Sequence, residues 1–265
     1  MPELPEVETI VRGLQRPLVG RAFTYVIALW PNSIKTPLPE LQGRLPGQRI
    51  EAVTRRGKYL RFHLSHGDNL FLHLKMSGSL SVEPVDAPRH HHLRTIFGLD
   101  NNHELRFKDT RKFGRVYLVD DPATVIGNLG PEPLADDFRP EDFKALFRQR
   151  TGRLKPLLLN QTFIAGIGNI YADESCYAAG IDPRRPADSL TPEELEKLYH
   201  AIREALRNGI LSKGASFDEV YRGGEFQDQF QVYGRAGEGC FTCGAPVQRV
   251  LLGGRSTHFC GQCQR

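Results

Sequence analysis

The sequence is poor in the features that mark membrane-bound and secreted proteins. It has no apolar run of the roughly 18 residues that a membrane-spanning helix needs. Its start, Met1-Pro2-Glu3-Leu4-Pro5-Glu6, is acidic and does not resemble a signal peptide. No internal repeat is present. We therefore expect a cytoplasmic protein that does not act at a membrane.

Excess charge of one sign is also scarce. The net charge is only +4 and the isoelectric point is about 8.8, so composition leans only slightly toward a polyanionic partner. Basic residues are nevertheless concentrated in two stretches, 54–58 and 106–115, with aromatic residues interleaved in the second. Such stretches are typical of nucleic-acid contacts, but charged hairpin edges look the same. Both interpretations stay open at this point.

The chain is long enough for more than one domain, since it has 265 residues, 40% hydrophobic and 25% charged. Period-two alternation predicts strands at 22–29, 48–55, 58–64, 69–75, 93–99, 104–108 and 114–119, hence a sandwich or barrel. A proline-containing linker is expected at 122–141. Beyond it, helical spacing predicts helices at 141–149, 154–160, 170–179 and 192–211, and 213–231 reads as a loop. We predict domains at 1–130, 131–231 and 232–265.

The N-terminal residues combine a packed helix with potential chemistry. Apolar positions from Leu4 to Leu18 have helical spacing, and Gly20 can end the helix. If Met1 is removed, Pro2 offers a secondary amine that can attack a sugar carbon, with Glu3 as the acid–base group. The alternative is an ordinary helix start with proline in the first turn and acidic residues beside the dipole.

Four of the five cysteines form a metal-binding pattern, Cys240-x2-Cys243 followed by Cys260-x2-Cys263. In a cytosolic chain this spacing predicts one structural zinc ion held by four thiolates, with a pair of disulfides as the alternative. The fifth, Cys176, is expected to be buried. Between the cysteine pairs, residues 250–259 predict a hairpin whose glycine turn presents Arg255 at its tip.

Several motifs, taken together and in this order, are those of a known family. They are Met1-Pro-Glu-Leu-Pro-Glu-Val-Glu-Thr, Gly57-Lys-Tyr-Leu, His73-Leu-Lys-Met-Ser-Gly-Ser-Leu, Asp109-Thr-Arg-Lys-Phe-Gly, Gly166-Ile-Gly-Asn-Ile-Tyr-Ala-Asp-Glu, Phe230-Gln-Val-Tyr-Gly-Arg and the zinc hairpin. Over nearly its whole length the chain resembles the bacterial formamidopyrimidine-DNA glycosylases. No single motif would be specific.

The resemblance implies an α+β multidomain fold: an N-terminal β-sandwich with flanking helices, then a helical domain with a helix–two-turn–helix and a zinc finger. It implies an enzyme that excises oxidised purines from double-stranded DNA and nicks the strand by β,δ-elimination. We expect it to act as a monomer. The catalytic residues would be Pro2, Glu3, Lys58 and Arg255. The DNA contacts would be His73, Met76, His92, Arg111, Phe113, Arg150, Lys155 and Asn169.

Some positions depart from the family pattern. Arg94 stands where a second histidine is common, Lys112 where arginine is common, and Asn160 where aspartate is frequent. The loop at 214–230 looks a few residues shorter than usual, which leaves the preferred lesion open. Two other functions remain to be separated: a related endonuclease for oxidised pyrimidines, against which Leu4 argues, and a zinc DNA-binding protein without catalysis.

Overall fold

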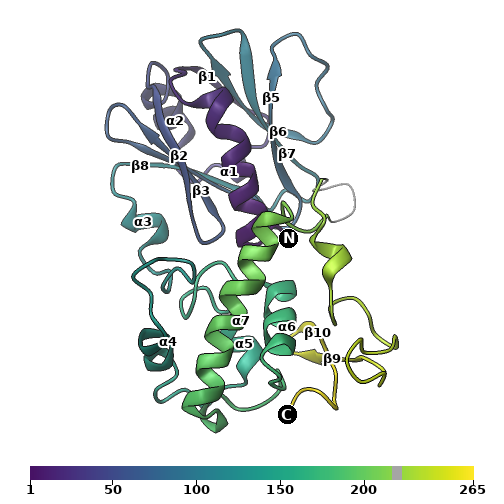
Figure 1. Cartoon of the computed structure of the whole chain (residues 1–265). Helices are drawn as coiled ribbons and strands as arrows, with labels where there is room; N and C mark the ends of the chain where they lie inside the picture. The colour runs from purple at the N-terminus through teal and green to yellow at the C-terminus, as the bar shows by residue number, and fades with distance from the viewer. Residues whose placement is uncertain (217–222) are drawn as a thin grey trace. The chain divides into compact units, whose positions relative to one another are not determined.

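The computed structural model describes residues 1–216 and 223–265, and the chain forms two compact units in it (Figure 1). The first is built from Met1–Asn128, and the second mainly from Leu129–Ala215 and Gly224–Arg265. None of the helices in the described ranges is long and apolar enough to cross a membrane.

The first unit is a β-sandwich of two four-stranded antiparallel sheets. One sheet has the order β1 (Phe23–Ala28), β6 (Leu93–Leu99), β7 (His103–Asp109), β5 (Gly78–Pro84). The other has the order β2 (Ile50–Arg56), β3 (Tyr59–Leu64), β4 (Asn69–His73), β8 (Arg115–Val119). The predicted sandwich is therefore confirmed.

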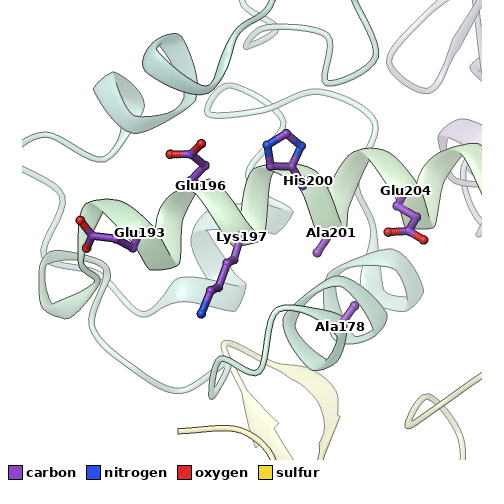
Figure 2. Close-up of a pocket in the computed structure, with 7 residues that line it drawn as sticks. All are labelled: Ala178, Glu193, Glu196, Lys197, His200, Ala201 and Glu204. Carbon is purple, nitrogen blue, oxygen red and sulfur yellow. The ribbon is translucent and has the colours of Figure 1, made fainter.

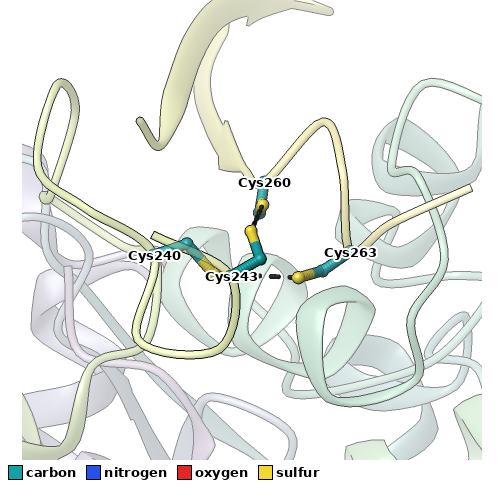
Figure 3. Close-up of side chains that lie close together, drawn as sticks. All are labelled: Cys240, Cys243, Cys260 and Cys263. Carbon is teal, nitrogen blue, oxygen red and sulfur yellow. Dashed lines mark hydrogen bonds between the residues drawn. The ribbon is translucent and has the colours of Figure 1, made fainter. Parts of the chain in front are cut away.

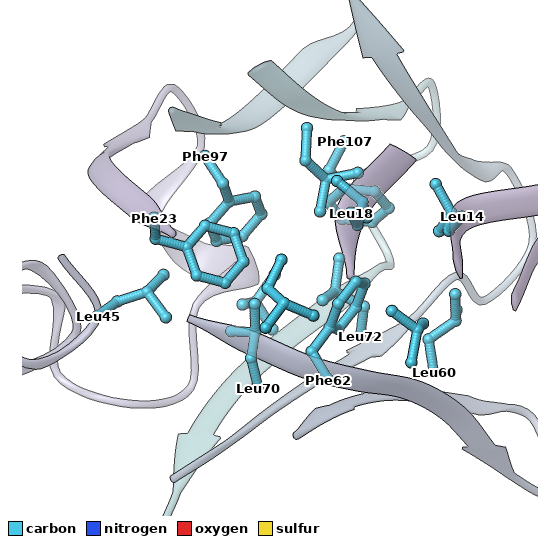
Figure 4. Close-up of a cluster of buried hydrophobic side chains, with 14 of the residues drawn as sticks. Leu14, Leu18, Phe23, Leu45, Leu60, Phe62, Leu70, Leu72, Phe97 and Phe107 are labelled. Carbon is cyan, nitrogen blue, oxygen red and sulfur yellow. The ribbon is translucent and has the colours of Figure 1, made fainter. Parts of the chain in front are cut away.

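The core of this unit is one apolar cluster to which both sheets contribute (Figure 4). Phe23, Phe97 and Phe107 come from the first sheet, and Phe62 and Leu72 from the second. Helix α1 (Leu4–Leu18) adds its buried face, because its apolar residues recur at helical spacing on one side. The helix carrying the N-terminal residues is thus anchored in the core.

The second unit is helical, with a hairpin near its end. Its main helices are α4 (Pro140–Leu146), α5 (Leu154–Leu159), α6 (Asn169–Ala178) and α7 (Pro192–Leu211). Helix α7 begins at a capping box made by Thr191 and Glu194 and packs on α4 and α6. The hairpin of β9 (Gln248–Leu252) and β10 (Arg255–Phe259) packs on α6.

Several elements in the described ranges were not expected from the sequence, including the short 3-10 turns Pro31–Ser33 and Ala187–Ser189. Helix α2 (Leu38–Arg44) and edge strand β5 lie in the first unit, and the short helix α3 (Ala123–Ile126) lies within the predicted linker. A 3-10 turn, Phe226–Gln229, interrupts the predicted loop at 213–231. Residues 217–222 of that loop, and so most of the segment that looks shortened, lie outside the described part of the chain.

Candidate functional site

The N-terminal residues are held in place by the first turn of α1. Glu3 is the N-cap, and its backbone N–H donates to Glu6 Oε2 at 2.7 Å. Pro2, Glu3 and Glu6 are all buried. The predicted nucleophile and its acidic neighbours thus lie at the start of a helix fixed by the core, which is the rigid support that reacting groups need.

Lys58 lies in the two-residue turn between β2 and β3 and is buried. Gly57, the first turn residue, has a φ of 55°, as a type II′ hairpin turn requires. Strands β2 and β3 pair from Arg56 and Tyr59 onward, so the turn consists only of Gly57 and Lys58. The hairpin therefore fixes the backbone from which the Lys58 amine projects.

Basic groups from three neighbouring strands converge beside this turn. Tyr59 pairs with His73 across β3 and β4, and His73 pairs with Arg115 across β4 and β8. The electrostatic neighbours of His73 are Lys75, Lys58 and Arg115, in that order. We call Lys58, His73, Lys75 and Arg115 the basic cluster. Such a cluster suits a phosphate.

Within the basic cluster, His73 is neutral. Burial, followed by the charges of Lys75, Lys58 and Arg115, lowers the pKa of His73 to about 3. Its Nδ1 accepts a hydrogen bond from the Lys75 backbone N–H at 3.0 Å. A neutral ring that accepts at Nδ1 carries its proton on Nε2, so His73 can donate from that atom. Lys75 and Arg115 were not predicted as site residues. Lys75 lies two residues after His73, whereas Arg115 reaches the cluster only through the pairing of β4 with β8.

A tight turn after β7 presents Arg111 and Phe113 to solvent. The buried carboxylate of Asp109 accepts the backbone N–H groups of Arg111 at 3.2 Å and Gly114 at 2.7 Å. The Arg111 guanidinium carbon lies 5.0 Å from the centre of the Phe113 ring, a cation–π contact. Asp109 thus fixes a turn that exposes a cation and an aromatic ring.

The turn between β4 and β5 is tied to the same carboxylate. Ser77 donates to Asp109 Oδ1 and accepts the Arg111 backbone N–H at 2.9 Å. Met76, next to Ser77, is half-buried. The structure therefore brings the backbones that carry Met76, Arg111 and Phe113 together, as their predicted common role requires.

Lys112, between the two exposed residues of the turn, contacts the only tryptophan of the chain. Its Nζ lies 4.1 Å from the centre of the Trp30 ring. Lys112 also has a positive φ of 59°, so its backbone occupies the left-handed region that closes the turn. This contact attaches the middle of the turn, at Lys112, to Trp30.

In the second unit, the turn between α5 and α6 is fastened by Gln161. Its side chain accepts the Gly166 N–H at 2.9 Å and donates to Ile167 O at 2.9 Å. Asn169 is the first residue of α6 and half-buried, so it lies at a helix start, where anions bind. Arg150 is exposed in the segment after α4.

Lys155 on α5 is completely buried, which the amino-acid sequence did not indicate. Its Nζ pairs with Asp173 Oδ1 of α6 at 2.7 Å and donates to Ser256 O of β10 at 2.7 Å. The second oxygen of Asp173 accepts the His258 backbone N–H at 2.9 Å. The predicted DNA contact of Lys155 stays a prediction. The structure gives the residue a second role, attaching the β9–β10 hairpin to the helices.

The hairpin presents Arg255 as predicted. Gly253 and Gly254 have φ values of 57° and 74°, which a type I′ turn requires, and Arg255 follows directly and is exposed. A Cβ on Gly253 would lie 3.3 Å from Pro156 Cγ, so the turn approaches α5 closely. Arg255 is therefore fixed next to the helix that carries Lys155.

The four cysteines of the predicted metal site point toward one another (Figure 3). Their Sγ atoms all lie within 4.8 Å of one another, with 3.8 Å between Cys240 and Cys263 and 3.5 Å between Cys243 and Cys260. A tetrahedral zinc ion with Zn–S bonds of about 2.3 Å separates its sulfurs by about 3.8 Å. The residues fit one structural zinc ion. Cys176 is buried elsewhere, as expected.

A surface pocket of about 520 Å³ between α6 and α7 does not belong to this set (Figure 2). Glu193, Glu196 and Glu204 line it together with Lys197 and His200. The excess of carboxylates repels phosphate, so a polyanion does not fit here.

A β-sandwich with a buried N-terminal turn, followed by a helix–two-turn–helix unit with a four-cysteine zinc finger, defines a class of DNA-repair proteins. Three family models match: Formamidopyrimidine-DNA glycosylase N-terminal domain over residues 1–116, Formamidopyrimidine-DNA glycosylase H2TH domain over 129–219, and Zinc finger found in FPG and IleRS over 237–265. The chain belongs to the formamidopyrimidine-DNA glycosylase family.

Individual relatives agree along the whole length. Formamidopyrimidine-DNA glycosylases of Herpetosiphon aurantiacus and Pelotomaculum thermopropionicum are each 44% identical, covering 100% of this chain and 100% and 99% of theirs. Lactococcus lactis Fpg in complex with DNA containing an abasic site has a TM-score of 0.94 at 36% identity, covering 99% of each chain. MutM in complex with DNA containing carbocyclic 8-oxo-G has a TM-score of 0.95 at 37% identity, covering 100% of each chain. The resemblance, the predicted fold and the zinc finger are confirmed.

Proposed function

We propose that this protein is a bifunctional DNA glycosylase and abasic-site lyase that removes oxidised purines, 8-oxoguanine and formamidopyrimidines, from duplex DNA. The observation that carries the proposal is the buried first turn of α1, where Pro2 lies beside Glu3 and Glu6 in the unit that also holds the basic cluster. Family membership over the full length supports the same activity. Structures of relatives contain DNA with an abasic site, Fapy-dG or 8-oxo-G.

The chemistry begins with the amine of Pro2 once Met1 has been removed. The amine attacks C1′ of the damaged nucleotide, and the bond from C1′ to the base breaks as the base leaves with the electron pair. Glu3 takes up the proton that the attacking Pro2 nitrogen loses and delivers it to the ring oxygen O4′ as the C1′–O4′ bond opens, which leaves an iminium between Pro2 and the sugar. The expelled base takes a proton from water. Loss of a proton from C2′ expels the 3′ phosphate, and a second elimination expels the 5′ phosphate.

The remaining predicted residues hold the DNA open and in register. Lys58, His73 and Arg255 contact phosphates near the lesion, as does Asn169, and positive charge there stabilises the departing phosphate. Met76, Arg111 and Phe113 fill the gap left by the extruded nucleotide, whose extrusion costs a few kcal/mol. His92 and Arg150 contact the backbone farther away. We propose a monomer acting on duplex DNA in the cytoplasm.

A borohydride trapping assay tests the nucleophile. Duplexes carrying 8-oxoguanine, a formamidopyrimidine or an oxidised pyrimidine are incubated with the protein, and the covalent adduct is mapped by mass spectrometry. We expect an adduct at Pro2 with the two purine lesions, a slower one for Pro2→Gly, and none when the terminus is blocked. An adduct that maps to a lysine contradicts the assignment, and preference for the pyrimidine would favour the related endonuclease.

Arg111→Ala tests the gap-filling turn separately from the chemistry. A bidentate contact to the orphaned base discriminates by roughly 1–3 kcal/mol. We therefore expect the variant to lose most of its preference for the base opposite the lesion, while nicking at a preformed abasic site stays close to wild type. Arg12→Ala, an exposed arginine on α1, is the matched control. Equal losses on both substrates would place Arg111 in general DNA binding.

A further inference from the structure

Arg94, which stands where the family commonly has a second histidine, occupies an irregular position in the first sheet. Leu93 pairs with Lys108 and Thr95 with Phe107, so the register between β6 and β7 shifts at Arg94. A bulge of this kind turns a side chain away from the regular alternation of the strand. The carbonyl of Arg94 is itself held, because it accepts the N–H groups of Leu29 at 2.8 Å and Trp30 at 3.0 Å.

The side chain of this bulge residue connects two predicted DNA-contacting segments. Arg94 Nε donates to the carbonyl oxygen of Asp109 at 2.7 Å, at the base of the turn that carries Arg111 and Phe113. Its Nη2 lies 3.2 Å from Nδ1 of His92. One guanidinium therefore spans from the histidine loop to the gap-filling turn.

The contact between Arg94 and His92 determines which ring nitrogen of His92 carries the proton. A guanidinium is always protonated and has no acceptor, so Nδ1 of His92 must be the acceptor. A ring that accepts at Nδ1 is neutral and has its hydrogen on Nε2. The same state is imposed on His73 by a backbone donor, the Lys75 N–H. Both histidines predicted to contact DNA thus have Nδ1 occupied.

The backbone of His92 is fixed as well. Its N–H donates to His90 Nδ1 at 3.1 Å, and its carbonyl accepts the Asp109 N–H at 2.9 Å. The groups that face the His92 ring are His90, His91, Arg94 and Asp109, and only Asp109 favours the imidazolium. The pKa of His92 is accordingly lowered, first by desolvation and then by His91 and Arg94.

We propose that Arg94 is a positioning residue that holds His92 as a neutral Nε2–H donor to a DNA phosphate and ties it to the turn bearing Arg111 and Phe113. The proposal rests on the proposed function in one respect, that His92 faces DNA. The tautomer itself is a property of the free protein. His92 then contributes a hydrogen bond to binding without contributing a charge.

The first measurement needs no DNA and no activity. In protein with 15N-labelled histidine, the ring signals of His92, assigned by their loss in His92→Gln, should show an unprotonated Nδ1 and a protonated Nε2 at pH 7. In Arg94→Met the ring should become a mixture of tautomers, with a higher pKa. A His92 that is cationic at pH 7 in the wild type, or unchanged in Arg94→Met, overturns the proposal. The wild-type spectrum decides even if a variant folds poorly.

The second measurement is the salt dependence of binding to a duplex with a reduced abasic site. Each cation that contacts a phosphate contributes about 0.9 to the slope of log K against log salt. His92→Gln should weaken binding yet leave the slope unchanged, whereas a slope lower by about 0.9 would show a charged contact and overturn the proposal. Arg94→Met should weaken binding roughly tenfold, as loss of an ordered, charge-assisted hydrogen bond does, and Arg12→Met should not.

The two measurements separate the inference from the proposed function. If the tautomer is as proposed but neither His92→Gln nor Arg94→Met affects binding, the DNA contact of His92 is wrong and the positioning role with it. Retained excision by the wild type would still support the glycosylase. If Pro2 cannot be trapped while the histidine results hold, the catalytic proposal fails and the inference stands.

Discussion

Two hairpins of this protein each present a basic residue at or directly after a two-residue turn, and they are held in different ways. The β2–β3 hairpin places Lys58 in its turn, and the β9–β10 hairpin places Arg255 directly after its turn. The first belongs to a sheet whose inner face is part of the large apolar cluster of the sandwich. Burial of that cluster holds the two strands on either side of Lys58, and an ion pair between Arg55 of β2 and Glu8 of α1 adds to it.

The second hairpin has a much smaller apolar base. Beside it lies a cluster of Val232, Val247 and two of the metal-site cysteines, with Tyr177 of α6 at its edge, and the hairpin itself buries Leu252 and Phe259. Zinc and the buried contacts of Lys155, Asp173 and His258 supply what burial does not. A short segment can therefore be as firmly held as a sandwich strand, but its stability then depends on a few specific atoms.

The largest expected effect is loss of the metal. Cys243→Ser removes one of four thiolates, and structural zinc contributes on the order of 10 kcal/mol in isolated fingers. We expect zinc to be released, amide protection in β9 and β10 to disappear, and DNA binding to weaken, while the sandwich stays folded. Metal analysis and hydrogen exchange of the two units test this. A zinc-free protein with full activity would contradict the claim that zinc holds the β9–β10 hairpin in place.

The next largest effect concerns the buried ion pair. Lys155→Met leaves the Asp173 carboxylate without its cation, and breaking one side of a buried pair costs about 3–5 kcal/mol. We expect a corresponding loss in the free energy of unfolding of the helical unit and faster exchange of the His258 amide, which Asp173 accepts. Urea unfolding and hydrogen exchange measure both.

The chain contains a matched control for that prediction. Lys144 Nζ pairs with Glu196 Oε2 at the same distance, 2.7 Å, but the two side chains are 28% and 51% exposed, whereas those of Lys155 and Asp173 are fully buried. Exposed pairs contribute about 0–1 kcal/mol. Lys144→Met should therefore change stability little. Equal effects at Lys144 and Lys155 would mean that burial of the second pair does not matter.

The smallest expected effect is a loss of folding stability of the sandwich in acid. Since folding lowers the pKa of His73 from about 6.5 to about 3, the unfolded chain binds a proton between these values that the native chain does not. Stability is therefore lost as pH falls below about 6.5, by about 2 kcal/mol between pH 7 and 5. His73→Gln should remove this part of the acid sensitivity, measured by urea unfolding at both pH values. If His73→Gln leaves the pH dependence of stability unaltered, another group binds the proton on unfolding.

The elements that could be predicted from the sequence are those with a strong pattern of their own. Helix α1 shows its buried face as helical spacing, and β3 alternates between buried and half-buried residues. Strand β5 was missed because it is an edge strand that pairs only with β7 and leaves most of its residues half-exposed. Helix α2 was missed because it is short and buries only Leu41. An element that buries few of its residues leaves only a weak hydrophobic periodicity in the sequence.

The site shows the same limit. Motif order pointed to Lys58, His73 and Arg255, but the contribution of Arg115 to the basic cluster depends on how β4 and β8 pair. The burial of Lys155 depends on three segments of the chain. One of its partners, Ser256, lies 101 residues farther along the sequence. Tertiary pairing of this kind has no local signal.

The contact between Lys112 and Trp30 gives the protein an internal optical probe. Because Trp30 is the single tryptophan, indole emission reports on one place, the ring against which the gap-filling turn rests. A cation 4.1 Å from the ring centre affects that emission, so any shift of the turn on entering a duplex changes intensity or wavelength. Stopped-flow fluorescence of the unlabelled protein can therefore time insertion of the turn separately from bond cleavage.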